Sequence, residues 1–405
     1  MGMMIFAKTV LQKYCTVYAG LPRAVWYGIA IGFLNAIQNN LFFFLSTYLV
    51  RTLHISIDRA GYTLSCYALG TLLGSILGGK LSDHFSARTV SIIAPLVVGF
   101  VYGILGFLRI PWEIDLAAFC MGLAGYAFLT ANSAEVLSHC PYPQMRVQAL
   151  SLLAVVANLG FSCSGVLVGV FEHYGFPVIF MSVGAFSLIV NFCRIFQHPL
   201  MPSSREERPA TSPQPQTNTK PYYGKYLLII ALGVVFLVNL IYAQVSSTYP
   251  IYITQHFSLK AFTFLMVLNA LFIVFFSVPI NHYFKKKNKM VMLGIGGFLF
   301  GCGMLMLVIF TQSLTWTFFA LWIFTVGEIV FLAMAQEICY ATSHASKKGL
   351  GLGLYRGTTA VSRMVGPTLG TGIYHNFGAW FVWVFCGVIG LVSFIIGWLC
   401  KKHAT

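Results

Sequence analysis

Residues 201–244 read MPSSREERPATSPQPQTNTKPYYGKYLLIIALGVVFLVNLIYAQ and join two unlike kinds of sequence. Up to residue 222 the stretch is polar and rich in Pro, Ser, Thr and Gln, a composition typical of a disordered linker. From residue 225 it is an apolar run, long enough to cross a bilayer, which takes about 20 residues of α-helix. The stretch therefore predicts a polar loop followed by a membrane-spanning helix.

The rest of the chain has the same apolar character. Of its 405 residues, 58% are hydrophobic and only 9% are charged, whereas soluble domains carry about a quarter charged residues. The length leaves room for about twelve spans with short loops. We therefore expect an all-α membrane protein with spans at residues 23–50, 60–80, 89–108, 114–136, 147–171, 176–196, 225–251, 260–283, 290–311, 315–338, 350–374 and 379–400.

The polar linker at 201–224 separates these spans into two sets of six. We expect an N-terminal six-helix bundle over residues 1–200 and a C-terminal six-helix bundle over residues 225–405. Because an even number of spans lies between them, the linker and both chain ends are expected on one side of the membrane.

Two segments of the first half recur about 200 residues later. GKLSDHFSAR at 79–88 parallels PINHYFKKKN at 279–288, and GVFEHYG at 169–175 parallels GIYHNFG at 372–378. The two bundles are therefore expected to be pseudo-symmetric. Repeated halves with a binding site at their interface are what transport by alternating access requires.

The basic residues predict which side each loop faces. If the N-terminus is cytoplasmic, the opposite side keeps only Arg51, Arg59, Arg109 and Lys260. Because cytoplasmic loops carry an excess of Lys and Arg, we expect both termini inside a multi-pass protein of the inner (plasma) membrane. This distribution accounts for the net charge of +15 without a nucleic-acid partner. The cytoplasmic set is Lys8, Lys13, Arg23, Lys80, Arg88, Arg146, Arg194, Arg205, Arg208, Lys220, Lys225, Lys285, Lys286, Lys287, Lys289, Lys347, Lys348, Lys401 and Lys402.

Signatures of several other functions are missing from the sequence. The ten cysteines include no CxxC pair and no Cys/His cluster, so we expect neither a metal nor a cofactor. GSILGGKL at 74–81 nearly spells a phosphate-binding loop, but Leu81 replaces the hydroxyl residue that binds magnesium, which argues against an ATP-driven pump. Neither H-E-x-x-H nor G-x-S-x-G occurs, so an enzyme is not expected. The lack of an N-x-[ST] sequon favours a bacterial source.

GKLSDHFSAR at 79–88 resembles the loop motif G-x-x-x-D-[RK]-x-G-[RK]-[RK] of the major facilitator superfamily. Gly79, Asp83 and Arg88 match the motif, and the three other defined positions depart from it. The resemblance extends over essentially the whole chain and implies a transporter with two six-helix bundles. It also implies that Asp83 pairs across the interface of the halves and latches the outward-open state. The alternative is a solvated loop with positive-inside charges.

Three further motifs bear on the branch of the superfamily. Gly327-Glu328 resembles a step in the tenth helix of some proton-driven drug exporters and oligopeptide transporters. QVSSTYP at 244–250 resembles the Q-x-x-S-x-x-P end of the seventh helix in the multidrug branch. GPTLGTG at 366–372 resembles the glycine-rich signature that antiporters carry in the fifth helix, but here the fifth span lacks the Gly-Pro step. The first two motifs favour the multidrug branch, and the missing step weakens the case for antiport.

Glu328 lies near the middle of a predicted span. A charged carboxylate at this depth costs about 3 kcal/mol or more, so the group is expected to be neutral or paired. A carboxyl in such a place can bind a proton from one side of the membrane and release it to the other. We therefore expect Glu328 to be the proton-coupling group; the alternative is a structural partner of a nearby arginine.

Arg356 and Arg363 share one face of the eleventh span, two turns apart. Arginine keeps its proton, so within the membrane it must face a polar cavity or a carboxylate. We expect Arg356 to reach the cytoplasmic surface. For the deeper Arg363 two roles stay open, which are pairing with Glu328 and binding an anionic group of the substrate.

Polar residues on four helices are candidates for the wall of a substrate cavity. The first, fourth, seventh and tenth helices line the cavity in the superfamily, which implies this role for polar residues of the first, fourth and seventh spans. Polar side chains also hold membrane helices together, and that alternative stays open for each residue. Asn269, on a supporting helix, is expected to hold helices together. The predicted wall consists of Asn35, Gln38, Asn39, Asn132, Asn239, Tyr242, Gln244 and Arg363.

Three functions remain in competition. The leading hypothesis is a monomeric secondary active transporter for proton-coupled efflux of drugs or metabolites, with a small-molecule substrate, protons and membrane lipid as its partners. The second is an importer of an anionic nutrient, peptide or siderophore-like carboxylate chelator, which Arg356, Arg363 and the missing Gly-Pro step support. The third is a non-transporting membrane sensor built on the same fold.

Overall fold

The computed structural model describes residues 20–140, 142–197, 224–284, 287–309, 313–341 and 348–403. These residues form helices joined by short connections, and no strand occurs among them. Residues 201–223 of the predicted linker lie outside the described ranges.

Each of the twelve predicted spans corresponds to one long helical segment, with boundaries that differ by a few residues. The bilayer explains this agreement, because lipid forces every backbone N–H and C=O of a span to pair within its own helix. The first segment combines α2 (Arg23–Asn40), η1 (Leu41–Phe44), α3 (Leu45–Thr47) and η2 (Tyr48–Thr52). The others are α4 (Ile57–His84), α5 (Ala87–Leu105), α6 (Pro111–Ser138), α7 (Pro143–Phe171), α8 (Phe176–Phe196), α9 (Gly224–Gln244) with α10 (Thr248–His256), α11 (Leu259–Phe284), α12 (Lys289–Ile309), α13 (Leu314–Ala341), α14 (Lys348–Phe377) and α15 (Ala379–Leu399).

Helix α14 differs from the other segments in composition. Among the described residues, eleven segments are long and apolar enough to cross a membrane, and α14 is not one of them. With 30 residues it is long enough, but it carries Arg356, Arg363 and many Gly and Thr residues. It packs against α4, α9, α13 and α15. Neighbouring helices therefore cover part of it, including the region of the half-buried Arg363, whereas Arg356 is exposed. A membrane helix tolerates charge where it faces other helices or a polar cavity.

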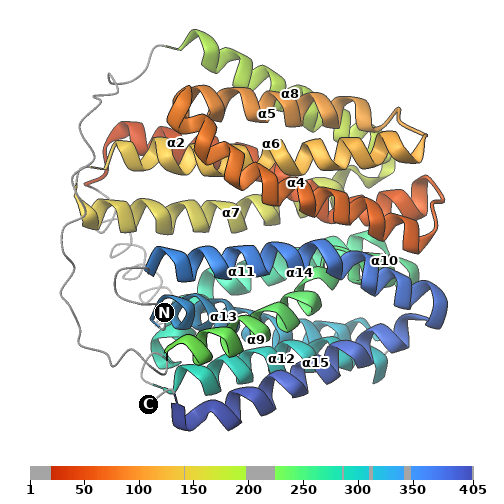
Figure 1. The fold of residues 1–405 in the computed structure, drawn as a ribbon. Helices are drawn as coiled ribbons and strands as arrows, with labels where there is room; N and C mark the ends of the chain where they lie inside the picture. Colours follow the sequence, from red (N-terminus) through yellow and green to blue (C-terminus); the bar gives the residue numbers. More distant parts are fainter. Residues whose placement is uncertain are drawn as a thin grey trace, which may run out of the picture.

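The helices form two groups, with α2 and α4–α8 above and α9–α15 below in Figure 1. The groups repeat local detail as well as helix order. Asn35 donates its side-chain amide to the carbonyl of Ile31 at 3.0 Å, and Asn239, one repeat later, donates to the carbonyl of Val235 at 2.8 Å. The fold is therefore an all-α membrane bundle of two pseudo-symmetric halves.

The two ends of the molecule are named here after the short helices η5 (Cys400–His403) and η3 (Glu172–Tyr174). At the η5 end, Asn288 before α12 donates to the carbonyl of Lys401 at 3.0 Å. At the η3 end, Arg59 in the first turn of α4 forms an ion pair with Asp115 in the first turns of α6.

Helices α4 and α14 join the two groups at the η3 end. A β-carbon added to Gly61 of α4 would lie 2.9 Å from the carbonyl oxygen of Pro367 in α14. One turn further along, the hydroxyls of Ser65 and Thr368 lie 2.8 Å apart. Glycine permits this approach, because a larger residue would force the helices apart.

Helices α7 and α11 join the groups at the same end. Gly165 and Gly169 of α7 lie against the turn of α11 that contains Thr263. Beside them, the rings of Phe44 and Phe262 meet edge to face, with centroids 5.5 Å apart. The two groups are therefore packed against each other at the η3 end in this conformation.

We expect a disulfide to form readily in the double variant Ser65→Cys/Thr368→Cys. The native hydroxyls are 2.8 Å apart, and a disulfide needs β-carbons about 3.5–4.5 Å apart. Mass tagging of free thiols after mild oxidation of membranes measures the yield. Cys66 is replaced by Ala in every variant, and the two single-cysteine variants are the controls. Free thiols at both positions after oxidation would contradict the packing of α4 against α14.

Candidate functional site

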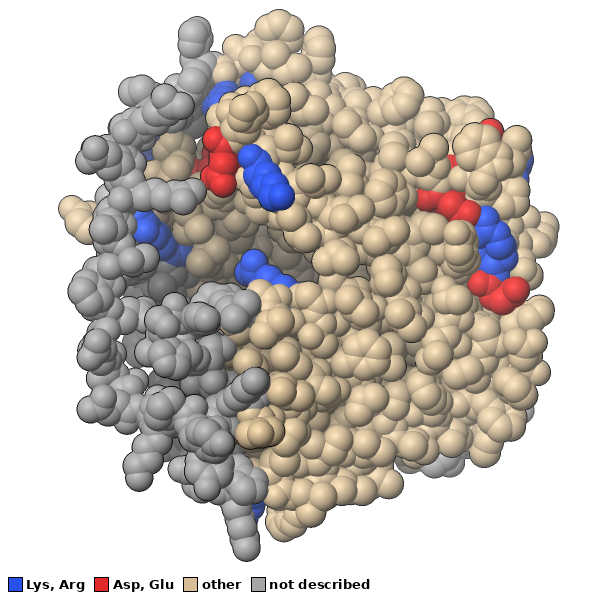
Figure 2. Space-filling view, in the orientation of Figure 1, with Lys and Arg blue, Asp and Glu red and all other residues tan. Residues whose placement is uncertain are grey.

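A cavity of about 250 Å³ lies between the two groups of helices. Figure 2 shows the molecule hollowed between the groups, towards the η5 end. This volume lies just below the range of about 300–1,000 Å³ for the pockets of drug-sized ligands, so the cavity suits a smaller organic molecule. Its wall combines aromatic and polar side chains from both groups: Phe42, Phe43, Tyr67, Tyr126, Tyr242, Asn39, Asn40, Thr71, Ser246 and Arg363.

Arg363 is the charged residue of this wall. Its guanidinium carbon lies 4.4 Å from the centroid of the Tyr242 ring. A cation–π contact of this kind contributes about 0.5–2 kcal/mol and offsets part of the cost of holding a cation in the membrane. The buried Nε of Arg363 has no hydrogen-bond partner in the described part of the protein. The guanidinium therefore has a donor left for another group.

Glu328 lies at the middle of α13 and is 6% exposed. It is not among the residues that line the cavity. It interacts with three residues from three other helices: Tyr242 of α9, Asn269 of α11 and Arg363 of α14. Tyr242 therefore contacts both the cavity and Glu328, and the carboxyl and the guanidinium lie within electrostatic reach of each other.

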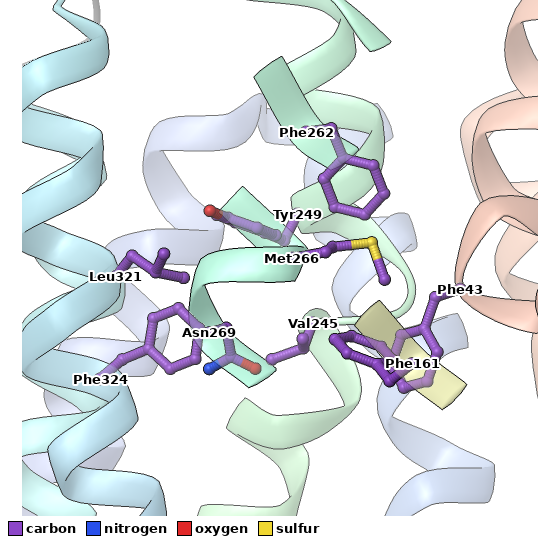
Figure 3. A pocket seen from close by; sticks show the side chains of 9 residues that line it. All are labelled: Phe43, Phe161, Val245, Tyr249, Phe262, Met266, Asn269, Leu321 and Phe324. Carbon is purple, nitrogen blue, oxygen red and sulfur yellow. The ribbon is translucent and has the colours of Figure 1, made fainter. Parts of the chain in front are cut away.

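Asn269 is a member of the Glu328 environment that the sequence did not reveal. Its amide donates to Thr325 at 2.8 Å, one turn before Glu328. Figure 3 shows Asn269 among the rings and aliphatic side chains around a small space. This space has a volume of only about 10 Å³ and is also lined by Leu321 and Phe324, which precede Glu328 on α13. Phe43 and Phe161 of the first group close this space against the second group. The only signal in the sequence was an isolated polar residue within an apolar span.

The predicted wall residues divide into two classes. Asn39, Tyr242 and Arg363 line the cavity, and their contact with a substrate stays a prediction. Asn40, which was not predicted, also lines it, beside the point where α2 gives way to the tighter helix η1. Two consecutive asparagines at the end of α2 therefore lie at the same wall.

The remaining predicted wall residues do not line this cavity in this conformation, and their contact with a substrate stays a prediction. Gln244 donates to the carbonyl of Gly366 at 3.0 Å and so ties α9 to α14. Gln38 accepts a hydrogen bond from Ser187 at 2.6 Å, and Asn35 accepts one from Asn191 at 3.3 Å, so both tie α2 to α8. These residues join helices, because each helix is oriented about its axis so that their side chains face a neighbouring helix. Asn132 and Asn239 are buried, each with a side-chain oxygen that has no partner among the described residues.

Comparison with known proteins bears on the family. The sequence model described as Major Facilitator Superfamily matches residues 28–355. The chain belongs to the major facilitator superfamily. It is 24% identical over 350 residues to the MFS-type transporter YqjV of Bacillus subtilis, which covers 83% of this chain and 82% of that protein. It is 22% identical over 340 residues to the multidrug resistance protein MdtH of Salmonella arizonae, which covers 82% of each.

Solved structures of other transporters share the fold of this chain. A POT family transporter in complex with a thioalcohol-conjugated peptide superposes with a TM-score of 0.77 at 14% identity and covers 95% of this chain and 97% of that one. The nucleoside transporter NupG gives 0.72 at 12% identity, with 94% and 99% covered. At these identities the likeness shows the fold alone. The family places the chain among membrane transporters rather than enzymes.

The motif at 79–88 is mostly helical in this transporter rather than a loop. Gly79 and Asp83 lie within α4, and Arg88 lies in the first turn of α5. Arg88 donates to the carbonyl of Gln197 after α8 at 2.6 Å, so it holds helices of one group together. Ser86 takes the place of the motif glycine and adopts φ 124°, a conformation that favours glycine. The latch role of Gly79, Asp83 and Arg88 concerns the opposite conformation and stays a prediction.

A buried ion pair near the η5 end corrects the placement of Arg194 in a cytoplasmic loop. Arg194 is 2% exposed. It donates to the carbonyl of Ser91 at 2.8 Å and lies 3.5 Å from Glu135. Glu337 of α13 lies one repeat after Glu135, but its cation comes from another helix: it pairs with Lys289 of α12 at 2.5 Å, and both side chains are over a third exposed.

Loss of the buried pair should destabilise the transporter far more than loss of its exposed counterpart. Arg194→Met leaves Glu135 buried without its cation, which costs about 3–5 kcal/mol. Lys289→Met breaks a pair worth about 0–1 kcal/mol. The melting temperature of the protein in detergent measures both. Equal melting temperatures for the two variants would contradict the buried pair.

Proposed function

We propose that this protein is a secondary active transporter that couples the movement of a small organic solute to protons at Glu328. The supporting observation is a buried carboxyl whose neighbours Tyr242 and Arg363 form part of the wall of a solute-sized cavity. A group that takes up a proton in this place changes the charge that the cavity presents to its ligand.

The coupling follows from the cost of charge in the membrane. Deprotonated Glu328 carries a negative charge that needs Arg363 as its partner. Once Glu328 is protonated, the charge of Arg363 is no longer balanced by this carboxyl. The proton and the solute therefore influence each other through the same guanidinium.

Alternating access accounts for the packing of the two groups. Closure at the η3 end leaves the cavity to be reached from the η5 end, which carries most of the basic loop residues. By the positive-inside rule, the η5 end faces the cytoplasm, in the inner membrane of a bacterium. The outward-facing state then requires α4 to separate from α14, and α7 from α11, while the region around Asp83 closes.

The direction of transport has two candidates. Relatives named multidrug resistance proteins support efflux of drugs or metabolites. The position of Arg363 in the cavity wall supports the second candidate, uptake of an anionic solute. Flux measurements in both directions in oriented vesicles separate them.

Glu328→Gln should abolish accumulation driven by a proton gradient while it leaves passive exchange intact, because Gln keeps the shape of the side chain but cannot titrate. Proteoliposomes with an imposed pH gradient and a panel of labelled organic acids and cationic dyes provide the measurement. Glu337→Gln, an exposed carboxylate on the same helix, is the matched control. If Glu328→Gln leaves gradient-driven accumulation and its pH dependence unchanged, the coupling assignment fails.

A further inference from the structure

The charge of the cavity wall restricts the solutes that can enter. Among the described residues that line the cavity, Arg363 carries a permanent positive charge and no Asp or Glu is present. A cation placed there would face Arg363 without a carboxylate in contact. An anion would meet an opposite charge in a partly desolvated site, where charge pairing is strongest.

The guanidinium is placed to bind a second group. Its carbon lies over the ring of Tyr242, at 4.4 Å from the ring centroid, and a cation–π contact of this kind uses none of its N–H donors. Its buried Nε has no partner in the part of the chain that the structure describes. A carboxylate accepts two parallel hydrogen bonds from a guanidinium, an arrangement that a neutral solute cannot reproduce.

The rest of the wall suits an apolar or aromatic body. Phe42 and Tyr67 stack with centroids 3.5 Å apart and form one aromatic surface. Tyr126 adds another ring, and the amide of Asn39 lies beside it at Gly125. The cavity thus combines aromatic faces and a few polar groups with one cation among its described residues.

We infer that the transported solute is an organic anion, bound through a carboxylate or similar oxyanion at Arg363, and that protonation of Glu328 strengthens its binding. The inference rests on the coupling role proposed for Glu328. While Glu328 is ionised, it shares the guanidinium and repels the anion. Once Glu328 is protonated, Arg363 is free to pair with the anion alone.

Glu328 is the carboxyl of this cluster, and the proposal assigns the pH dependence to it. The other titratable groups that interact with Arg363 are four phenols, one on its own helix and three on other helices: Tyr355 on α14, Tyr242 on α9, Tyr126 on α6 and Tyr67 on α4. Phenols stay neutral up to about pH 10. The facing neighbours of Glu328 are Tyr242, Arg363 and the uncharged Asn269. A change in affinity between about pH 5 and pH 8 therefore reports on Glu328.

Cooperative binding of the proton and the anion determines whether they move in the same or in opposite directions. If the proton increases the affinity for the anion, the anion increases the affinity for the proton by the same factor. Proton and anion then cross the membrane together, so an inward proton gradient drives uptake. Joint binding accordingly favours the second of the two candidate directions.

Equilibrium binding to the purified transporter in detergent tests the solute class. The probes are a panel of aromatic and aliphatic carboxylates, each paired with its neutral amide and with a quaternary ammonium analogue of similar size. We expect carboxylates to bind at least about tenfold more tightly than their amides, the usual cost of losing a charged hydrogen bond. A panel in which no carboxylate exceeds its amide, or in which the ammonium compounds bind best, overturns the inference.

Variants of the two arginines of α14 test the site. Arg363→Ala should weaken binding of the best carboxylate about 10- to 100-fold, while Arg356→Ala, exposed on the same helix, should leave it unchanged. Arg363→Lys keeps the positive charge but lacks the planar pair of N–H donors, so it should give an intermediate loss of affinity. Equal affinity in wild type and both Arg363 variants overturns the inference. The comparison of acid and amide in the wild type stands even if a variant misfolds.

An aromatic sulfonate, which stays ionised at every pH used, tests the link to the proton. Its affinity for the wild type should rise as pH falls, whereas Glu328→Gln should bind it tightly at all pH values. If Glu328→Gln still shows proton-driven flux while carboxylates bind the wild type as expected, the proposed coupling is refuted but the anion site is kept. Proton coupling at Glu328 with a preference for neutral or cationic probes would refute the anion site alone.

Discussion

The structure depends on the cost of holding Glu328 and Arg363 at membrane depth. A lone charge there costs about 3 kcal/mol or more, so neither side chain is stable without the other or without a polar cavity. Helices α13 and α14, which pack against each other, supply the two groups, and Tyr242 of α9 interacts with both. This requirement explains why α14, the least apolar of the long helices, packs at the interface of the two halves rather than at their periphery.

Closure at the η3 end gives this charged cluster a single side of access. Gly61 brings α4 against α14, and Gly165 and Gly169 bring α7 against α11. Phe43 and the aromatic residues around Asn269 then fill the space between Glu328 and that end. Small residues thus allow close helix contact where the two halves meet, and large aromatic rings fill the space from which solvent is excluded. A rocking motion that parts the two helix pairs would carry the cavity to the other side.

The fold followed from the sequence because the bilayer leaves a span few choices of structure. The position of Glu328 was informative for a similar reason, because a carboxylate within a membrane span must be neutral, paired or functional. The cavity wall could not be predicted as well. Whether Gln244 faces a solute or the carbonyl of Gly366 depends on a partner far along the chain. Arg194 ends an apolar run and so resembled a loop residue, although Glu135 holds it inside.

Proton uptake on ligand binding tests the central claim most directly, because it measures the link between Glu328 and the anion site without any flux. An aromatic sulfonate is added in excess to the purified transporter in weakly buffered solution, and the pH change is recorded. The account predicts uptake of up to about one proton per bound anion in the wild type and none in Glu328→Gln. Proton release, or the same uptake in both proteins, would contradict it.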